Sequence, residues 1–254
     1  MTSGPDNRKS PAEKPEFDSY ATGYAAGMDN SVKALMGASA DDFLAVKLDW
    51  LLRAFPELGV SNRRENLTIR LLDYGCGTAA LLRLIARRGL RLGLAGCDIS
   101  DAMLAEGAGT WPRDIAALPE LVKQDGARVD FPDASFDFII ISAVLHHVPP
   151  KERGPVYAEL NRVLRPGGCV VVFEHNPLNP VTRLVVARTP IDRNAILLRA
   201  SEVVNGLCDA GFATPNTSYL MFAPPRLGFG AGFDAALRWL PLGAQYAVTA
   251  RRRA

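Results

Sequence analysis

The stretch Leu71-Leu72-Asp73-Tyr74-Gly75-Cys76-Gly77-Thr78 decides the fold class of this chain. Its apolar start, within residues 69–74, is typical of a buried strand, and the two glycines are typical of a tight turn. Residues 79–88 predict a helix that Gly89 ends. A glycine turn between a strand and a helix lets the backbone approach a ligand, and the helix N-terminus can hold an anion. The stretch therefore predicts a ligand-binding strand–loop–helix unit.

Strand and helix patterns alternate on the C-terminal side of this unit. The expected strands are 92–98, 121–123, 136–142 and 169–173, and the expected helices are 101–106, 151–164 and 201–211. Helices between strands predict right-handed crossovers and a doubly wound, mainly parallel α/β sheet. Two later strand-like pieces, 218–222 and 245–249, predict antiparallel strands at the edge of that sheet.

Composition and charge exclude several classes of protein. The 254 residues are 48% hydrophobic and 22% charged, with a net charge of +2, so no global attraction to nucleic acid or anionic membranes is expected. No apolar run approaches the length of a membrane span, and the N-terminus lacks a secretory pattern. The four cysteines are far apart, which predicts reduced thiols in a cytoplasmic protein.

Acidic residues follow the second and third predicted strands. In a doubly wound sheet, ligands bind at the carboxyl ends of the strands. Asp98 follows the glycine turn by about 20 residues, a spacing that suits a carboxylate bound to ribose hydroxyls. Asp125 can accept a hydrogen bond from an adenine amino group. The pattern Gly75-x-Gly77-x-x-Ala80 also fits the dinucleotide fingerprint, so the loop alone leaves an NAD(P)-dependent oxidoreductase open.

Four motifs in order resemble those of class I S-adenosylmethionine-dependent methyltransferases of the small-molecule type. They are residues 71–78, residues 95–100 with 103–105, residues 125–126 with 131–137, and residues 163–168. The resemblance spans about residues 17–211. It implies a seven-stranded Rossmann-like sheet with an antiparallel last strand and S-adenosyl-L-methionine as cofactor. It also implies methyl transfer to a small-molecule acceptor by in-line displacement. A non-catalytic cofactor-binding protein on the same fold is the remaining alternative.

The resemblance implies a role for individual cofactor-binding residues. Asp73 supports the glycine loop, Asp98 binds the ribose hydroxyls, and Asp125 binds the adenine amine. The implied set is Asp73, Gly75, Cys76, Gly77, Asp98, Ile99, Met103, Asp125, Gly126, Ser142, Tyr20 and Tyr24. For Ile99 and Met103, ordinary core packing is an equal alternative to contact with adenine.

Two further features of the sequence bear on the predicted cofactor site. The segment Phe17–Tyr24 resembles one that closes over the cofactor in small-molecule methyltransferases, and Tyr20 and Tyr24 can offer rings to the sulfonium. Family members often carry glycine where this chain has Ala79, so the methyl group tightens the space near the loop without removing a hydrogen-bond donor.

The three histidines of the chain all follow predicted strands at the ligand-binding edge. His175, Glu174 and His147 are the candidates for a catalytic base or acceptor anchor, whereas His146 is predicted to be structural. A hydroxyl acceptor needs its proton removed, so candidate bases favour an oxygen acceptor over nitrogen or carbon. Methyl transfer from a sulfonium requires no metal. Adjacent histidines on a strand point apart, so no metal site is predicted from these residues.

The pairs Asn176-Pro177 and Asn179-Pro180 predict an extended, turning segment rather than a helix. Arg183, Arg188, Arg193 and Arg199 follow it, either as solvated surface or as ligands for an anionic acceptor. A lid here and a helical cap at the N-terminus enclose the pocket, which favours a small molecule over a protein or a nucleic acid as acceptor; neither nucleic acid nor membrane is expected as a partner.

The predicted organisation is one domain, at residues 17–254, behind a disordered leader at residues 1–16. Within the domain, the segments are a helical cap (17–60), a cofactor-binding core (66–175), an acceptor-side lid (176–200), and a C-terminal helix with antiparallel edge strands (201–254). No segment outside the core carries the pattern of a second hydrophobic core.

Overall fold

Residues 18, 39–59, 68–114, 117–224 and 230–254 are described by the computed structural model. They form one sheet with the strand order β4-β3-β2-β1-β5-β6-β8-β7. The strands are β1 (Arg70–Tyr74), β2 (Gly93–Asp98), β3 (Glu120–Asp125), β4 (Arg128–Val129), β5 (Phe136–Ser142), β6 (Leu164–His175), β7 (Phe212–Leu220) and β8 (Gln245–Arg252). The helices are α3 (Ala40–Ala54), α4 (Ala80–Arg87), α5 (Asp101–Gly109), α6 (Arg153–Val163), α7 (Pro180–Arg188), α8 (Ala200–Asp209) and α9 (Gly230–Leu237).

The centre of the sheet is parallel, which confirms the predicted doubly wound class. Strand β1 pairs in parallel with both β2 and β5, and β5 continues in parallel to β6. Strand β8 pairs with both β6 and β7 and is antiparallel to each. It therefore lies between them, and β7 forms the edge of the sheet. The two-residue β4 adds an eighth strand to the expected seven. The strand order reverses between β1 and β5, the place where such sheets bind ligands.

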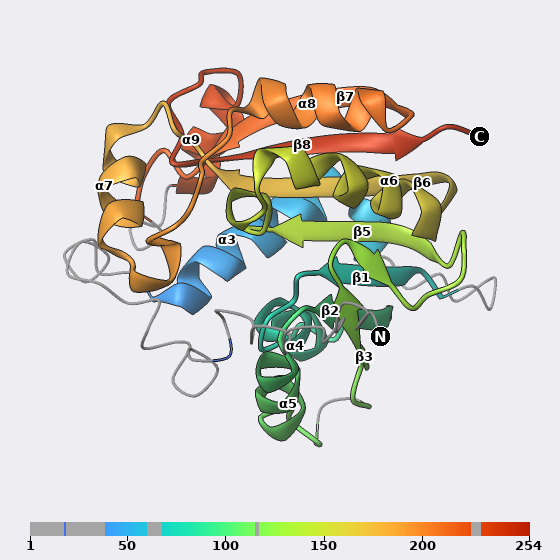
Figure 1. Cartoon of the computed structure of the whole chain (residues 1–254). Coiled ribbons are helices and arrows are strands. Elements are labelled where there is room, and N and C mark those ends of the chain that lie inside the picture. The colour runs from blue at the N-terminus through green and yellow to red at the C-terminus, as the bar shows by residue number, and fades with distance from the viewer. Residues whose placement is uncertain (1–17, 19–38, 60–67, 115–116, 225–229) are drawn as a thin grey trace, which may run out of the picture.

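Side chains on each central strand alternate between two hydrophobic cores. Leu72 and Ile139 face a core that α6 and α8 complete, whereas Leu71 and Ile140 face a core that α3 and α4 complete. Figure 1 shows α3 behind the strands and α6 in front of them. Because both faces are covered, consecutive residues within these strands are apolar, as at residues 138–141 of β5, which is the pattern that the sequence predicts for a buried parallel sheet.

The turn before the predicted fifth strand is part of β6. That strand begins at Leu164, and its pairing with β5 shifts register between Phe136 and Phe138. A side chain at Gly168 would place its Cβ 2.9 Å from the carbonyl oxygens of Arg165 and Asp137. Glycine is therefore required where the chain enters the sheet, because two backbone segments approach each other closely there.

The lid segment is partly helical, so the expectation of an extended backbone is wrong. Helix α7 starts at Pro180, in the first helical position, and the Asn179 side chain caps it by accepting a hydrogen bond from the Thr182 N–H. Asparagine before proline suits a helix start as well as a turn. The Asn176 side chain donates to the carbonyls of Pro241 and Gly243, which ties the segment to the loop before β8.

Most of the predicted leader and cap lies outside the described residues. Within the cap, α3 confirms the expected helix, and Ser39 caps it in a reciprocal pair with Asp42. Among the helices in the described part of the chain, none combines the length and apolar character needed to cross a membrane.

Candidate cofactor and acceptor site

A cavity of about 980 Å³ opens at the carboxyl ends of β1 and β5. Its volume lies at the upper end of the range for small-molecule sites, about 300–1,000 Å³. The glycine loop, Asp98 and Met103 line one half, and His146, His147 and His175 line the other. The predicted cofactor and acceptor regions therefore share one cavity.

The glycine loop is anchored to the neighbouring strand. The N–H groups of Gly75 and Cys76 both donate to the Cys97 carbonyl at 2.8 Å. Gly75 has φ +76°, and a Cβ there would lie 2.4 Å from Cγ2 of Val144. The loop thus needs glycine both for its left-handed backbone and for its contact with the turn after β5.

Ala79 adopts a backbone conformation that favours glycine. It caps α4 in the left-handed region, at φ 56° and ψ 30°, and its methyl group is buried. An L-residue pays roughly 1–2 kcal/mol for this conformation. The departure from the family pattern is therefore a backbone strain at the start of α4 rather than the loss of a hydrogen-bond donor.

Asp98 lies at the end of β2 and organises the loop beside it. One carboxylate oxygen accepts from the Gly77 N–H at 2.8 Å, and the other accepts from the Ser100 N–H at 3.0 Å. Burial raises the pKa of Asp98, and these backbone hydrogen bonds oppose the rise. Both oxygens have remaining lone pairs, so the carboxylate suits a ligand with two adjacent hydroxyls.

The N-terminal segment that resembles a cofactor cover contributes one described residue to the site. The Ser100 hydroxyl donates to the Asp18 carboxylate at 2.5 Å, next to Asp98. Tyr20 and Tyr24 lie outside the described residues, so their predicted contact with the sulfonium stays a prediction. The position of Asp18 brings residue 18 to the cofactor half of the cavity.

A buried lysine that the sequence analysis missed faces the cavity. Lys47 Nζ donates to the Ser142 hydroxyl at 2.8 Å. Asp73 is only 3% exposed, and burial raises its pKa to about 7, although the charge of Lys47 acts against this. The sequence did carry an indication of this burial. Lys47 lies three or four residues from apolar side chains, so it shares the face of α3 that packs against the sheet.

On the predicted adenine side of the cavity, the lining differs from the residues that the family resemblance implies at one position. Met103 and Gly126 line the cavity as expected, and so does Ile99. Asp125 is exposed and is not among the described lining residues, whereas its neighbour Gln124 is buried and lines the cavity. The Gln124 Oε1 atom accepts no hydrogen bond from any described residue. A buried acceptor without a donor fits a ligand that carries an amino group.

Glu174 braces a backbone turn instead of facing the acceptor. It is 1% exposed, and the described lining of the cavity does not include it. One oxygen accepts from the N–H groups of Val144 and Leu145 at 3.0 and 2.7 Å, and the other lies 2.6 Å from His146 Nδ1. Burial raises its pKa, but the positive charge of His146 outweighs burial and lowers the pKa to about 2.

The same turn is held from its other side by Arg153. The guanidinium donates to the carbonyls of Leu145 and Val148 and, at 2.7 Å, to that of Ile196. The Ile196 N–H donates back to the His146 carbonyl at 2.7 Å. The backbone between β5 and α6 is therefore fixed by two buried charged residues and by the end of the lid.

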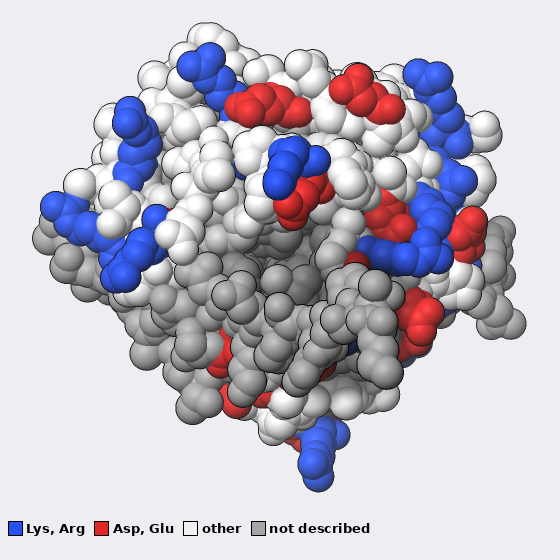
Figure 2. Space-filling model, in the orientation of Figure 1, with Lys and Arg blue, Asp and Glu red and all other residues white. Residues whose placement is uncertain are grey.

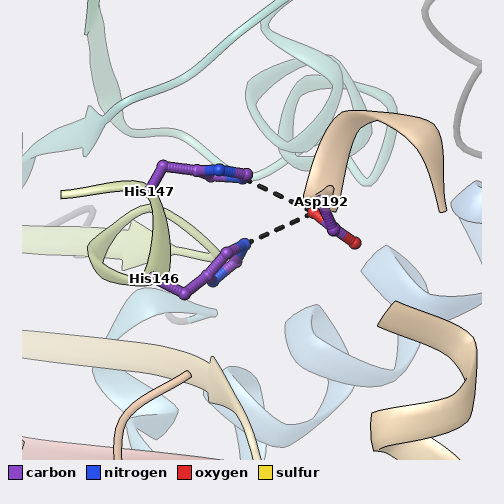
Figure 3. Close-up of side chains that lie close together, drawn as sticks. All are labelled: His146, His147 and Asp192. Carbon is purple, nitrogen blue, oxygen red and sulfur yellow. Dashed lines mark ion pairs between the residues drawn. The ribbon is translucent and has the colours of Figure 1, made fainter. Parts of the chain in front are cut away.

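The three histidines meet, contrary to the expectation that adjacent histidines point apart. His146 and His147 lie on a 3₁₀ turn, η3 (Leu145–His147), where successive side chains do not alternate across a sheet. Their ring centroids are 4.1 Å apart, and the His146 ring lies 5.1 Å from that of His175 at the end of β6. The lid adds Asp192, whose Oδ1 lies 3.5 Å from Nε2 of both His146 and His147 (Figure 3).

The charges of the three imidazoles differ. Burial opposes the protonated form of His146, but Glu174 and Asp192 outweigh it and raise the pKa to about 9. Burial and the positive charge of His146 lower the pKa of His147 to about 4 and that of His175 to about 3. Near pH 7, His147 and His175 are therefore neutral, and a neutral imidazole has one ring nitrogen that can accept a hydrogen bond.

The lid lines the cavity with apolar side chains, with the polar side chains of Asn179 and Thr182 and with one carboxylate, but with no arginine. Its lining residues include Val181, Val185, Ile191 and Asp192. The four arginines of residues 183–199 are exposed, and none belongs to the described lining. Figure 2 shows basic side chains on the surface on the side of α7, interspersed with uncharged residues. Of the two roles that the sequence left open for these arginines, a solvated surface agrees with their exposure.

Comparison with known proteins places the chain in a family. Residues 72–172 match the family model described as a methyltransferase domain. A ubiquinone/menaquinone biosynthesis C-methyltransferase from Bordetella avium is 30% identical over 70% of this chain and 71% of its own length. A phosphatidylethanolamine N-methyltransferase from Cereibacter sphaeroides is 35% identical, over 42% of this chain and half of its own length. The chain thus spans only part of some curated relatives that it matches.

The fold is also found among solved structures. A protein from Thermotoga maritima, described as an S-adenosylmethionine-dependent methyltransferase and possible histamine N-methyltransferase, has a TM-score of 0.62 at 16% identity. The match covers 93% of this chain and 98% of that one. The four sequence motifs, the strand order and these relatives agree, so the dinucleotide interpretation of the glycine loop is not supported. The chain belongs to the class I S-adenosylmethionine-dependent methyltransferases.

Proposed function

We propose that this chain transfers a methyl group from S-adenosylmethionine to a small, largely apolar molecule that carries a hydroxyl group. One observation carries the proposal: a single cavity joins a half that suits a nucleoside to a largely apolar half that ends in two neutral histidines, His147 and His175. Asp98 and the glycine loop belong to the first half. His147 and His175 belong to the second, beside apolar lid residues such as Val185 and Ile191.

The relatives support the class of acceptor and leave the accepting atom open. Their names describe methylation of quinone precursors at carbon and of a phospholipid headgroup at nitrogen. For this chain, the histidines favour an acceptor with an ionisable hydroxyl, because a base is needed to remove its proton. An exposed set of lid arginines gives no support to an anionic acceptor.

The residues of the cavity supply alignment and a base. When bound, S-adenosylmethionine provides a methyl group on a sulfonium, a leaving group that needs no further activation. Asp98 and the glycine loop orient the nucleoside, and the apolar half positions the acceptor oxygen in line with the methyl carbon. That oxygen would form the new bond to the methyl carbon as the sulfur–carbon bond breaks and its electron pair goes to sulfur, and His175 would take the hydroxyl proton.

Binding and transfer are tested in two measurements. Calorimetric titration is expected to show binding of S-adenosylhomocysteine and no binding of NAD⁺; the reverse result would reject the cofactor. The protein is then incubated with methyl-labelled S-adenosylmethionine and a cell metabolite extract, and labelled small molecules are identified. We expect label on an oxygen. Label on nitrogen or carbon would reject only the accepting atom, and binding without any transfer would favour a non-catalytic protein.

Replacement of His175 by alanine is expected to reduce turnover by about 10²–10⁴-fold, the usual contribution of a positioned base. Cofactor affinity should stay close to that of the unchanged protein, because His175 lies in the acceptor half. Turnover is measured on the labelled acceptor and affinity by calorimetry. His175→Gln retains hydrogen bonding without basicity. Recovery of turnover in this variant, or equal losses of turnover and affinity in the alanine variant, would contradict a role as base.

A further inference from the structure

We propose that His146, His147 and Asp192 bind a divalent first-row transition-metal ion, such as Zn²⁺, through Nε2 of both histidines and a carboxylate oxygen of Asp192. All three ligand atoms lie within 4.8 Å of one another. Figure 3 shows both rings pointing to the carboxylate. The site lies in the acceptor half of the cavity, and metal binding there does not depend on the proposed methyl transfer.

The two distances from Asp192 to the histidines suit one ion, and all three ligand atoms lie within 4.8 Å of one another. Asp192 Oδ1 lies 3.5 Å from Nε2 of His146 and 3.5 Å from Nε2 of His147. Ligands that are each about 2.0–2.2 Å from a tetrahedral zinc ion are about 3.3–3.6 Å apart. Both distances to Asp192 are therefore those of a shared ion, and they exceed a normal hydrogen bond.

The buried nitrogen of His146 gives a second, independent observation. The side chain is 1% exposed, and its Nε2 makes no hydrogen bond to any residue that the structure describes. Its other nitrogen, Nδ1, lies 2.6 Å from the Glu174 carboxylate. A carboxylate behind the distal nitrogen is the arrangement that fixes the tautomer of metal-binding histidines and raises their basicity.

The proposed ligands are held in place without an ion. Glu174 and Arg153 together fix the turn that carries both histidines, through five hydrogen bonds to its backbone and to Ile196. Asp192 ends the 3₁₀ turn η5 (Pro190–Asp192), and its N–H donates to Thr189. Its carbonyl accepts from Ala195. A preorganised set of ligands loses little conformational entropy when the ion binds.

The donor set selects the class of ion. Two imidazole nitrogens and one carboxylate oxygen suit Zn²⁺ or Fe²⁺, whereas Mg²⁺ and Ca²⁺ prefer oxygen ligands alone. Three protein ligands leave a coordination position free, as in catalytic zinc sites. Because all three residues line the cavity, that position faces the acceptor. If the proposed function is correct, the acceptor hydroxyl would bind there, and the ion would lower the pKa of that hydroxyl, which would ease transfer of its proton to His175.

Metal binding is measured on untagged, chelator-treated protein without cofactor or acceptor. Co²⁺ is titrated as the probe, because tetrahedral nitrogen–oxygen coordination gives visible absorption bands, and Zn²⁺ is then added to displace it. We expect one Co²⁺ per chain. Asp192→Asn and His147→Gln should each weaken binding by at least about 10–100-fold, the loss typical of even an outer partner of a metal ligand.

The matched control is Glu152→Gln, which removes a carboxylate that also lines the cavity but is 58% exposed and lies 3.8 Å from Lys151. It should bind Co²⁺ like the unchanged protein. Circular dichroism and thermal unfolding show whether each variant is folded. If Asp192→Asn does not fold, His147→Gln alone tests the loss of a metal ligand. The metal site would be overturned by the absence of cobalt bands in the unchanged protein, or by ligand variants that bind Co²⁺ as tightly as the unchanged protein does. Metal binding without methyl transfer would reject only the proposed function.

Discussion

Replacement of Glu174 by alanine is expected to lower the free energy of unfolding by about 3–5 kcal/mol, the cost of removing one partner from a buried ion pair. The variant leaves the His146 imidazole without its carboxylate. It also leaves the N–H groups of Val144 and Leu145 without an acceptor. This is a large share of a typical total stability of about 5–15 kcal/mol. Urea unfolding of the protein without cofactor measures it.

Glu152→Ala is the matched control, because it removes a glutamate that is exposed. Its effect should stay within about 0.5 kcal/mol. Glu174→Gln retains an oxygen that can accept from the two N–H groups but loses the charge beside His146, so an intermediate loss is expected. A Glu174→Ala protein with unchanged stability and slow turnover would return Glu174 to the acceptor-facing role that its sequence position suggests.

Replacement of Asp98 by alanine is expected to weaken S-adenosylhomocysteine binding by about 100-fold or more. A hydrogen bond to a charged group contributes about 1.5–3 kcal/mol, and two ribose hydroxyls are available to the carboxylate. The variant also frees the Gly77 N–H, which fixes the glycine loop. Calorimetric titration measures the change, and thermal unfolding without ligand shows whether the fold is retained.

The residue that contacts adenine is decided by two further variants, Asp125→Ala and Gln124→Leu. Their affinity for S-adenosylhomocysteine is measured beside that of Asp98→Ala. A loss of affinity in Asp125→Ala alone would support the position that the family resemblance implies. A loss in Gln124→Leu alone would support the buried residue that lines the cavity. If Asp98→Ala binds S-adenosylhomocysteine as tightly as the unchanged protein, the proposed ribose contact is wrong.

The cofactor half of the site could be predicted from the sequence because its geometry is local. The strand, the glycine turn and the following helix are adjacent in the chain, so β1, the loop and α4 form from residues 70–87. Asp98 is predictable for the same reason, since it ends the next parallel strand. The position of Gln124 in the cavity wall was missed because the choice between two adjacent residues at a strand end depends on which of them faces the cavity.

His147 and His175 of the acceptor half were named from the sequence, but the contacts that hold this half together could not be predicted because they join residues that are distant in the chain. Glu174 and His146 are 28 residues apart, and Lys47 and Ser142 are 95 apart. The pair Asn179-Pro180 was interpreted as a turn, although an asparagine before a proline fits the start of a helix equally well. The dipeptide alone therefore does not distinguish the two structures. Nothing in the sequence near Asp192 indicates that the lid carries this carboxylate to the two histidines.

By itself, the sequence determined the doubly wound sheet, the position of the glycine loop and the family, since strand periodicity and turn residues act over short distances. The tertiary structure alone decided that Glu174 braces a turn and that the arginines of the lid stay exposed. It also decided that His146, His147 and Asp192 converge. The reason is physical: a buried carboxylate must find hydrogen-bond donors, and which donors it finds depends on how β5, β6 and the lid pack together.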